Sequence, residues 1–476
     1  MENCLKILLL AFTIICLSTC SNVTPPPTTL LQNVIDSGLF RVITTNTPTT
    51  FYKNSDGFHG IEYKLAKGYA DYIGVDLDIY IAKDFNHIFS EIANGEAHVA
   101  AANLTVNQIH GQIVEYSIPY FQTNYQVIYK RNTKKPKSLN DTSEGRLEIL
   151  AGSSYIQMLE DAKIKNPNLK WKEVYHPNIE TLLKKISDGE LDYTIVDANS
   201  FKSIQLSYPE AEVAFSIDSK ESMSWALPKS NDNSLRDSVN DYFNTISKSG
   251  KLNRVIDEYY FVSEKKFNYF NSRVFLNHYE QRLPKYRDFF EREAKKYNGL
   301  DWKLLAALSY QESHWDYKAV SPTGVRGLMM LTLDTAKMMG IDNRINPEES
   351  IIGGAKYYSQ LYNRLPNRIN DPDKTWFALA AYNVGFGHLE DARIITENQG
   401  MNPDLWSDVR KHLPLLSDSN WYKYTSRGFA RGEEPVNYVA NIKKYYNALK
   451  WLTANEKKGA PIEDLLVNNI VSNDEL

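Results

Sequence analysis

The run QESHWDYKAVSPTGVRGLMMLTLDTA, residues 311–336, decides the fold of the carboxyl-terminal half of this chain. Just before it, DWKLLAALSYQE (301–312) repeats apolar residues at spacings of three and four, which predicts an α-helix. Glu312 ends that helix, and Leu308 and Trp315 are expected on the same face. A carboxyl group among apolar side chains has a raised pKa and can donate a proton near neutral pH. Position on a helix alone, however, favours an ordinary surface glutamate.

Around this run, residues 267–455 continue with helical periods and few strand-like runs, which predicts an all-α domain. The further helices are expected in YRDFFEREAKKY (286–297), TLDTAKMMG (332–340), IIGGAKYYSQLYNRL (351–365), TWFALAAYN (375–383) and VNYVANIKKYYNALKWL (436–452). Asp301 and Thr332 stand where N-cap residues bind the first free N–H groups of a helix.

Four blocks in this domain resemble, in the same order, the blocks of the soluble-lytic-transglycosylase family. They are ALSYQESHW (307–315), SPTGVRGLMML (321–331), AAYNVGFG (380–387) and VNYVANI (436–442). The resemblance implies a lysozyme-like α fold that acts on peptidoglycan glycan strands. It also implies cleavage of the MurNAc–GlcNAc β-1,4 bond without hydrolysis, which leaves 1,6-anhydro-MurNAc ends, and it makes Glu312 the catalytic residue.

The same resemblance assigns a group of residues to the substrate, namely Ser321, Gly327, Met329, Tyr382, Asn383 and Tyr438. A glycine such as Gly327 lets backbone approach a sugar ring closely. Tyr382 and Asn383 offer an aromatic ring and an amide that can orient a substrate. For Met329 and Tyr438, packing in the core is an equal alternative. Residues 327–329, Gly-Leu-Met, are called the GLM block below, and Met330 departs from the family pattern, in which glutamine often follows this block.

A second catalytic carboxylate is not apparent in the sequence. Ordinary glycosidases place two acidic residues across the bond that they cut. Asp316, Asp334 and Asp342 are near Glu312 in the chain, but none matches a family position. The resemblance implies that one glutamate first protonates the leaving oxygen and then takes a proton from the C6 hydroxyl of the sugar, which attacks C1.

The amino-terminal half alternates strand-like runs such as FRVITTN (40–46) with helical stretches such as YKLAKGYADYIG (63–74). This alternation predicts an α/β domain with a mostly parallel sheet. We expect the domain to span 33–266 in two lobes, the second covering about 131–220.

Three segments of this half resemble family 3 periplasmic solute-binding proteins: 57–80, 115–129 and 189–199. The resemblance implies two lobes that close on a ligand. It assigns Thr105 and Asp197 to the ligand, Asp197 facing an amino group. The arginine that clamps a ligand carboxylate is absent from LTVNQIHGQIVEYS (104–117). We therefore expect a muropeptide or a peptide stem rather than a free amino acid.

The amino terminus has the features of a lipoprotein signal peptide, 1–19, followed by a lipidated Cys20 and a proline-rich linker, 20–32. Thr19 departs from the usual small residue before the cysteine, and a buried first helix is the alternative. With Ser21 after the cysteine, the resemblance implies a lipid anchor in the outer membrane and a periplasmic location. Residues 456–476 form an acidic tail that is expected to be mobile.

Composition excludes several classes of function. Hydrophobic residues at 42%, charged residues at 24% and a net charge of -4 describe a globular protein with no basic field for nucleic acid. The three cysteines all lie in the first twenty residues and the nine histidines lack ligand spacing, so neither a metal nor another cofactor is predicted. A phosphate-binding GXXXXGK[ST] loop is also missing from the sequence.

Three functions remain open from the sequence. The first is a lytic transglycosylase that the solute-binding module regulates or targets. In the order of its two domains the chain resembles membrane-bound lytic transglycosylases. The second is a solute- or muropeptide-binding sensor lipoprotein with a weak or inactive catalytic domain. The third is a hydrolysing muramidase on the same fold. Glu312, Tyr382 and Asn383 favour the first over the second, because an inactive domain need not keep them.

Overall fold

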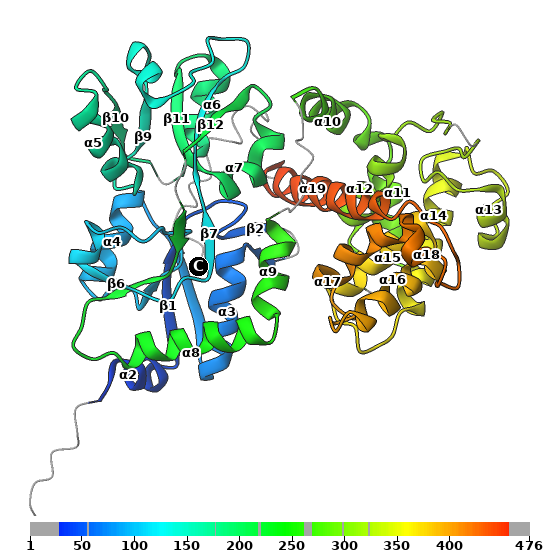
Figure 1. Cartoon of the computed structure of the whole chain (residues 1–476), viewed down its shortest axis with the longest axis horizontal. Coiled ribbons are helices and arrows are strands. Elements are labelled where there is room, and N and C mark those ends of the chain that lie inside the picture. Colours follow the sequence, from blue (N-terminus) through cyan, green and yellow to red (C-terminus); the bar gives the residue numbers. More distant parts are fainter. Residues whose placement is uncertain are drawn as a thin grey trace, which may run out of the picture.

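The computed structural model describes residues 28–54, 57–176, 178–217, 220–260, 269–297, 299–321 and 324–456 (Figure 1). The expected signal peptide with Cys20, the first part of the linker and residues 457–476 of the tail lie outside the described residues. No helix in the described ranges is long and apolar enough to cross a membrane.

The first lobe is built on a five-stranded sheet in the order β4-β1-β5-β14-β6. Its strands are β1 (Leu39–Thr44), β4 (Asp76–Ile81), β5 (Val99–Ala100), β6 (Val114–Tyr116) and β14 (Ala226–Pro228). Its helices are α2 (Leu30–Ser37), α3 (Ile61–Ile73), α4 (Phe85–Ala93), α8 (Ser234–Lys248) and α9 (Lys251–Tyr259). Strand β1 runs parallel to β4 and β5, as expected of a βαβ pattern. The large buried rings Phe40, Tyr69 and Trp225 pack between the sheet and the helices.

The second lobe has a three-stranded sheet in the order β11-β8-β12 and a parallel pair, β9 and β10. Its strands are β8 (Tyr125–Lys130), β9 (Glu148–Leu150), β10 (Lys172–Val174), β11 (Tyr193–Asp197) and β12 (Ala211–Ser216). Its helices are α5 (Tyr155–Lys165), α6 (Glu180–Asp188) and α7 (Ala198–Ile204). A parallel bridge between Leu147 and Tyr193 joins the pair to the sheet.

The expectation of a mostly parallel sheet is wrong for the second lobe, because β8 is antiparallel to both β11 and β12. The chain enters this lobe through β7 (Phe121–Thr123) and β8 and leaves it through β12 and β13 (Glu221–Met223). These two crossing segments lie side by side in opposite directions, with β13 also antiparallel to β7, so hydrogen bonding between them is necessarily antiparallel. A short pair, β2 (Tyr52–Asn54) and β3 (Gly57–His59), completes the strands of the described residues.

The remaining domain is all-α, as the sequence predicts, and shares one core. Its helices are α10 (Tyr269–Gln281), α11 (Arg287–Ala294), α12 (Trp302–Ser313), α13 (Leu333–Met339), α14 (Pro347–Arg364), α15 (Asp373–Val384), α16 (Phe386–Asn398), α17 (Trp406–His412), α18 (Ser419–Tyr422) and α19 (Glu433–Glu456). Short 3-10 turns occur in both domains, at His110–Gln112, Leu139–Glu144 and Gln205–Ser207 in the two-lobed domain and at Leu283–Lys285 and Leu413–Ser417 in the helical domain. The two predicted N-caps are confirmed: Asp301 accepts a hydrogen bond from the Lys303 N–H, and Thr332 accepts one from the Thr335 N–H.

Helix α19 links the helical domain to the two-lobed domain. Figure 1 shows it running from the middle of the helical domain towards α7. At its far end the Trp451 ring meets the Tyr52 ring at 5.3 Å, and the Asn447 amide donates to the Glu258 carbonyl of α9 at 3.1 Å. Helix α19 therefore belongs to the helical domain and also contacts the two-lobed domain.

Candidate active site

Helix α12 holds Glu312 at the edge of the helical core. Leu308 and Trp315, the expected neighbours on its face, are each 1% exposed. The chain turns after Ser313 because His314 and Trp315 take positive φ angles, 53° and 55°. The Trp315 indole N–H then donates to the Ala306 carbonyl at 2.9 Å, which locks the ring under the helix. Glu312 is thus presented from a rigid helix end on an apolar base.

The carboxyl group of Glu312 accepts a hydrogen bond from the Tyr438 hydroxyl of α19. Burial raises the pKa of Glu312 to about 7, and the Tyr438 hydrogen bond opposes part of that rise because it favours the charged form. The pKa of Tyr438 lies well above its usual range through its own burial, followed by the Glu312 charge, so its proton stays on the phenol. Near neutral pH Glu312 can therefore both give and take a proton.

The GLM block packs directly under this helix end. The Ser309 and Ser313 hydroxyls both donate to the Leu328 carbonyl, at 3.1 and 2.9 Å. The Met329 N–H donates to the Ser350 hydroxyl at 3.1 Å. These serines are the site residues that motif reading missed; the only signal for them is the i, i+4 spacing of Ser309 and Ser313 on the side of α12 that turns inward.

Two residues that the resemblance assigns to the substrate are packed against other parts of the chain. Met329 is 0% exposed, and its side chain occupies the space beside Gly354, where a Cβ would come within 2.5 Å of it. Of the two alternatives for Met329, burial favours core packing. Gly327 has a φ of +89°, and a Cβ there would lie 2.0 Å from the Arg344 carbonyl oxygen. The close approach that this glycine permits is to Arg344 of the chain itself.

Tyr382 lies beside the GLM block at the end of α15. Its hydroxyl donates to the Met329 carbonyl at 2.9 Å, and its ring packs against the Tyr357 ring of α14 at 5.1 Å. Burial, then the nearby charge of Glu312, raises the pKa of Tyr382 well above its usual range. Asn383 follows it and is exposed. Tyr357 joins this site without any signal in the sequence blocks.

Ser321 begins the loop after the catalytic helix. Its hydroxyl accepts a hydrogen bond from the Val325 N–H at 3.0 Å, and its carbonyl accepts one from the Gly324 N–H at 2.9 Å. The serine therefore closes a turn in the hairpin that leads to the GLM block.

The acidic residues near Glu312 in sequence do not couple to it. Among described groups, Tyr438 is the one side chain that shifts the pKa of Glu312, and no carboxylate does so. Paired glycosidase carboxyls lie about 5–9.5 Å apart, close enough to affect each other's ionisation. Within the described ranges no group of three or more His, Cys, Asp or Glu side chains is placed to hold a metal ion.

The two-lobed domain encloses a second candidate site, a cavity of about 80 Å³ between its lobes. Thr105 of the first lobe contacts the Ser154 hydroxyl of the second at 2.5 Å and the Tyr125 hydroxyl at 3.0 Å. Asp197 lines the same cavity, caps α7 through the Ser200 N–H at 2.8 Å, and has a pKa raised by burial. The described residues that line the cavity include no Lys, Arg or His. The lobes are closed on each other around one carboxyl group and many hydroxyls.

Known family models match both domains of the chain. Residues 289–404 match the Transglycosylase SLT domain, and residues 40–262 match family 3 of the bacterial extracellular solute-binding proteins, which confirms the two resemblances.

Relatives match the chain over nearly its whole length. A protein of Idiomarina loihiensis named membrane-bound lytic murein transglycosylase F is 44% identical over 447 residues, 94% of this chain and 96% of the relative. Membrane-bound lytic murein transglycosylase F 1 of Alkalilimnicola ehrlichii is 43% identical over 443 residues, 93% of this chain and 89% of the relative. Among solved structures, holo ArgBP from T. maritima is 18% identical, covers 48% of this chain and 97% of its own, and gives a TM-score of 0.41.

Proposed function

Because the chain belongs to the family of membrane-bound lytic murein transglycosylases F and is a peptidoglycan lytic transglycosylase, we propose that Glu312 alone serves as its acid and base. In its protonated form Glu312 donates to the glycosidic oxygen that leaves MurNAc C1. As carboxylate it then takes the proton of the MurNAc C6 hydroxyl, whose oxygen attacks C1. The products are a GlcNAc hydroxyl and a 1,6-anhydro ring, and no water is consumed.

The observation that carries this mechanism is the pKa of Glu312, raised to about 7 with no carboxylate among its described partners. A group that changes role within one turnover works best when its pKa is near the working pH. Tyr438 stabilises the carboxylate between the two steps, because its hydroxyl remains a donor. Asn383, which is exposed next to Tyr382, is proposed to orient the substrate's N-acetyl group, which would stabilise charge at C1.

Digestion of purified peptidoglycan tests the proposal. Mass spectrometry should find ends lighter by one water, which are anhydro ends, and Glu312→Gln should abolish them. Reducing ends would indicate a hydrolysing muramidase instead. Absence of any product from the unaltered protein would support a sensor with an inactive domain, the alternative that the relatives do not favour.

The two-lobed domain is proposed to bind a muropeptide or peptide stem. Asp197 supplies a carboxyl group for a ligand amine, and the cavity lining offers no guanidinium for a free amino acid carboxylate. A cavity of about 80 Å³ is too small for a peptide, so the lobes have to separate, which breaks the Thr105–Ser154 contact. Calorimetry with purified stem peptides tests this assignment, and no heat with any of them would overturn it.

Regulation of cleavage by this domain is proposed to pass through α7 and α19. Asp197 caps α7, and Lys202 of α7 acts electrostatically on Lys444 of α19, the helix that carries Tyr438. Movement of α7 on ligand binding therefore changes the forces on the helix that contacts Glu312. The test compares cleavage rates with and without a stem peptide that calorimetry shows to bind. Equal rates would refute regulation and would leave targeting of the enzyme as the proposed role of the domain.

The location proposed for the protein is the periplasmic face of the outer membrane, held by a lipid on Cys20. The membrane-bound names of its relatives support membrane association. Labelling with radioactive palmitate and separation of the two membranes test the finer assignment. A Cys20→Ala variant that keeps its label or its membrane fraction would contradict it.

A further inference from the structure

Two arginine side chains lie over the start of α16, the helix that follows the AAYNVGFG block. The guanidinium of Arg364, in the last turn of α14, stands 3.9 Å from the centre of the Phe386 ring. The Arg427 side chain lies on the backbone of Gly387, where a Cβ would come within 2.7 Å of its Nε atom. Both arginines are exposed, and we call them the arginine pair.

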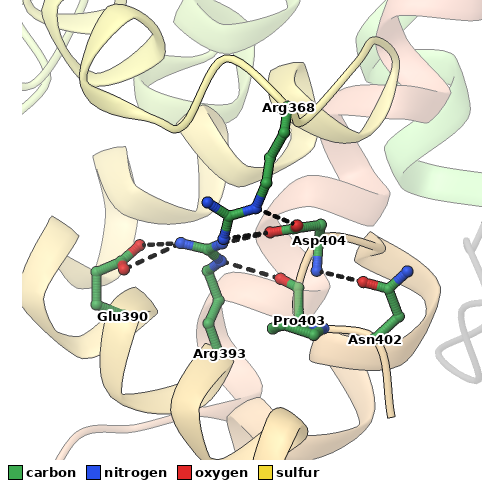
Figure 2. A network of polar contacts seen from close by, with 6 residues as sticks. All are labelled: Arg368, Glu390, Arg393, Asn402, Pro403 and Asp404. Carbon is green, nitrogen blue, oxygen red and sulfur yellow. Dashed lines mark hydrogen bonds and ion pairs between the residues drawn. The ribbon is translucent and has the colours of Figure 1, made fainter.

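The arginine pair differs from the neighbouring arginines in lacking a carboxylate partner among the described residues. Figure 2 shows the contrasting arrangement, in which Arg368 and Arg393 both bind Asp404 and Arg393 also binds Glu390. Those arginines hold α16 in place. The arginine pair makes no ion pair with any described acidic residue, so its N–H donors are available to a ligand.

The loop that carries Arg427 is held firmly to the helical domain. The carboxylate of Asp391, which is 4% exposed, accepts hydrogen bonds from the Ser426 and Arg427 N–H groups at 3.1 and 2.9 Å. The Gly428 N–H donates to the Thr425 hydroxyl at 3.1 Å. Because the Asp391 carboxylate binds two backbone N–H groups, it fixes the position of Arg427 and does not pair with the Arg427 side chain.

The arginine pair continues the line of the active site. Tyr357 and Arg364 are seven residues apart on α14, so they lie on one face of that helix about 10 Å from each other. Tyr357 packs against Tyr382, whose hydroxyl is within the field of Glu312. The charge of Arg364 also acts on Tyr357, so Arg364 lies on the face of α14 that is turned towards Tyr382.

We propose that Arg364 and Arg427 form a subsite for the carboxylates of peptide stems on the glycan strand that Glu312 cuts. The sugars of that strand are neutral, whereas its peptide stems carry free carboxylates. A guanidinium fork binds a carboxylate through two parallel hydrogen bonds. Since the net charge of the chain is -4, attraction to an anionic strand has to be local, and the arginine pair supplies it. This subsite rests on the proposed role of Glu312, which places the reacting bond.

The test measures kcat/KM on soluble glycan strands with intact stems and on the same strands after carbodiimide and methylamine have converted the stem carboxylates to neutral amides. Arg364→Gln and Arg427→Gln should each lower kcat/KM about tenfold on strands with free stem carboxylates and leave it unchanged on the amidated strands. Gly387→Ala, which pushes the Arg427 side chain away without a change of charge, should show a smaller loss of the same kind.

Arg292→Gln is the matched control, because Arg292 is exposed and pairs with Glu348 in the first turn of α14, about 24 Å from Arg364 along the helix. It removes one positive charge and should keep the wild-type value on both substrates. Equal losses for the arginine variants on both substrates would show a structural role, and no loss on either would show no role; both results overturn the subsite. Failure of the catalytic proposal would appear differently, as activity of Glu312→Gln on both substrates.

Discussion

Replacing Tyr438 with phenylalanine isolates the hydrogen bond that controls Glu312. The hydroxyl donates to the carboxyl group and favours its charged form, so its loss raises the pKa of Glu312 above about 7. A hydrogen bond to a charged group is worth about 1.5–3 kcal/mol, and one pKa unit corresponds to about 1.4 kcal/mol. Because the protonated acid keeps part of that bond, we expect a rise of about one unit.

The pH dependence of kcat/KM on soluble glycan strands measures this change. The first step needs protonated Glu312, so activity falls as the pH rises through its pKa, and that fall should move about one unit higher in Tyr438→Phe. Tyr446→Phe is a matched control on the same helix, since its hydroxyl donates to Asp301 at 2.8 Å and not to Glu312. A basic limb that stays in place or moves to lower pH in Tyr438→Phe would refute the assigned role of the hydroxyl.

Three further substitutions test the structure of the helical domain through its free energy of unfolding. Glu312→Gln should raise the melting temperature above pH 7 but not below pH 4.5. A carboxyl pKa raised from 4.5 to about 7 makes the wild type lose stability as the pH rises across that window, by at most about 3.4 kcal/mol. Calorimetry at pH 4 and pH 8 measures the difference between the two proteins. Gly327→Ala should lower the unfolding free energy by more than about 3 kcal/mol in urea, because its Cβ meets the Arg344 carbonyl. Gly324→Ala, which has open space around it, should lower that free energy by about 1 kcal/mol. Similar losses for the two variants would contradict the close approach at Gly327. Arg393→Met leaves Glu390 without its arginine and leaves Asp404 with Arg368 alone, so it should lower the unfolding free energy by about 1–3 kcal/mol. Thermal unfolding measures the loss, and a shift under about 0.5 kcal/mol would contradict it.

The helices of the catalytic domain could be predicted because their signals are local. Asp301 and Thr332 cap their helices as the sequence indicates, since a cap needs only the two or three residues after it. The sheet of the second lobe could not be predicted in the same way. The direction of β8 depends on its pairing with β12, which lies far along the chain and is set by how the two crossing segments meet.

The same division runs through the candidate site. The blocks around Glu312 and Tyr382 identify the kind of domain, but they do not say which side chains reach the substrate. Met329 belongs to a conspicuous block and is nevertheless fully buried, whereas Tyr357 belongs to no block and packs against Tyr382. Burial depends on all the elements that pack around a residue, and a short motif does not include those distant elements.

By itself the sequence determined that a glutamate would end an apolar helix in a lytic transglycosylase domain behind a solute-binding domain. Only the tertiary structure decided the chemistry of that glutamate. Its hydrogen-bond donor, Tyr438, is 126 residues away, and its pKa near 7 comes from burial that several helices create together. The arginine pair is likewise assembled from the end of α14 and the loop before α19. Local patterns fix helices, whereas ionisation and binding depend on the distances between residues that the folded chain brings together.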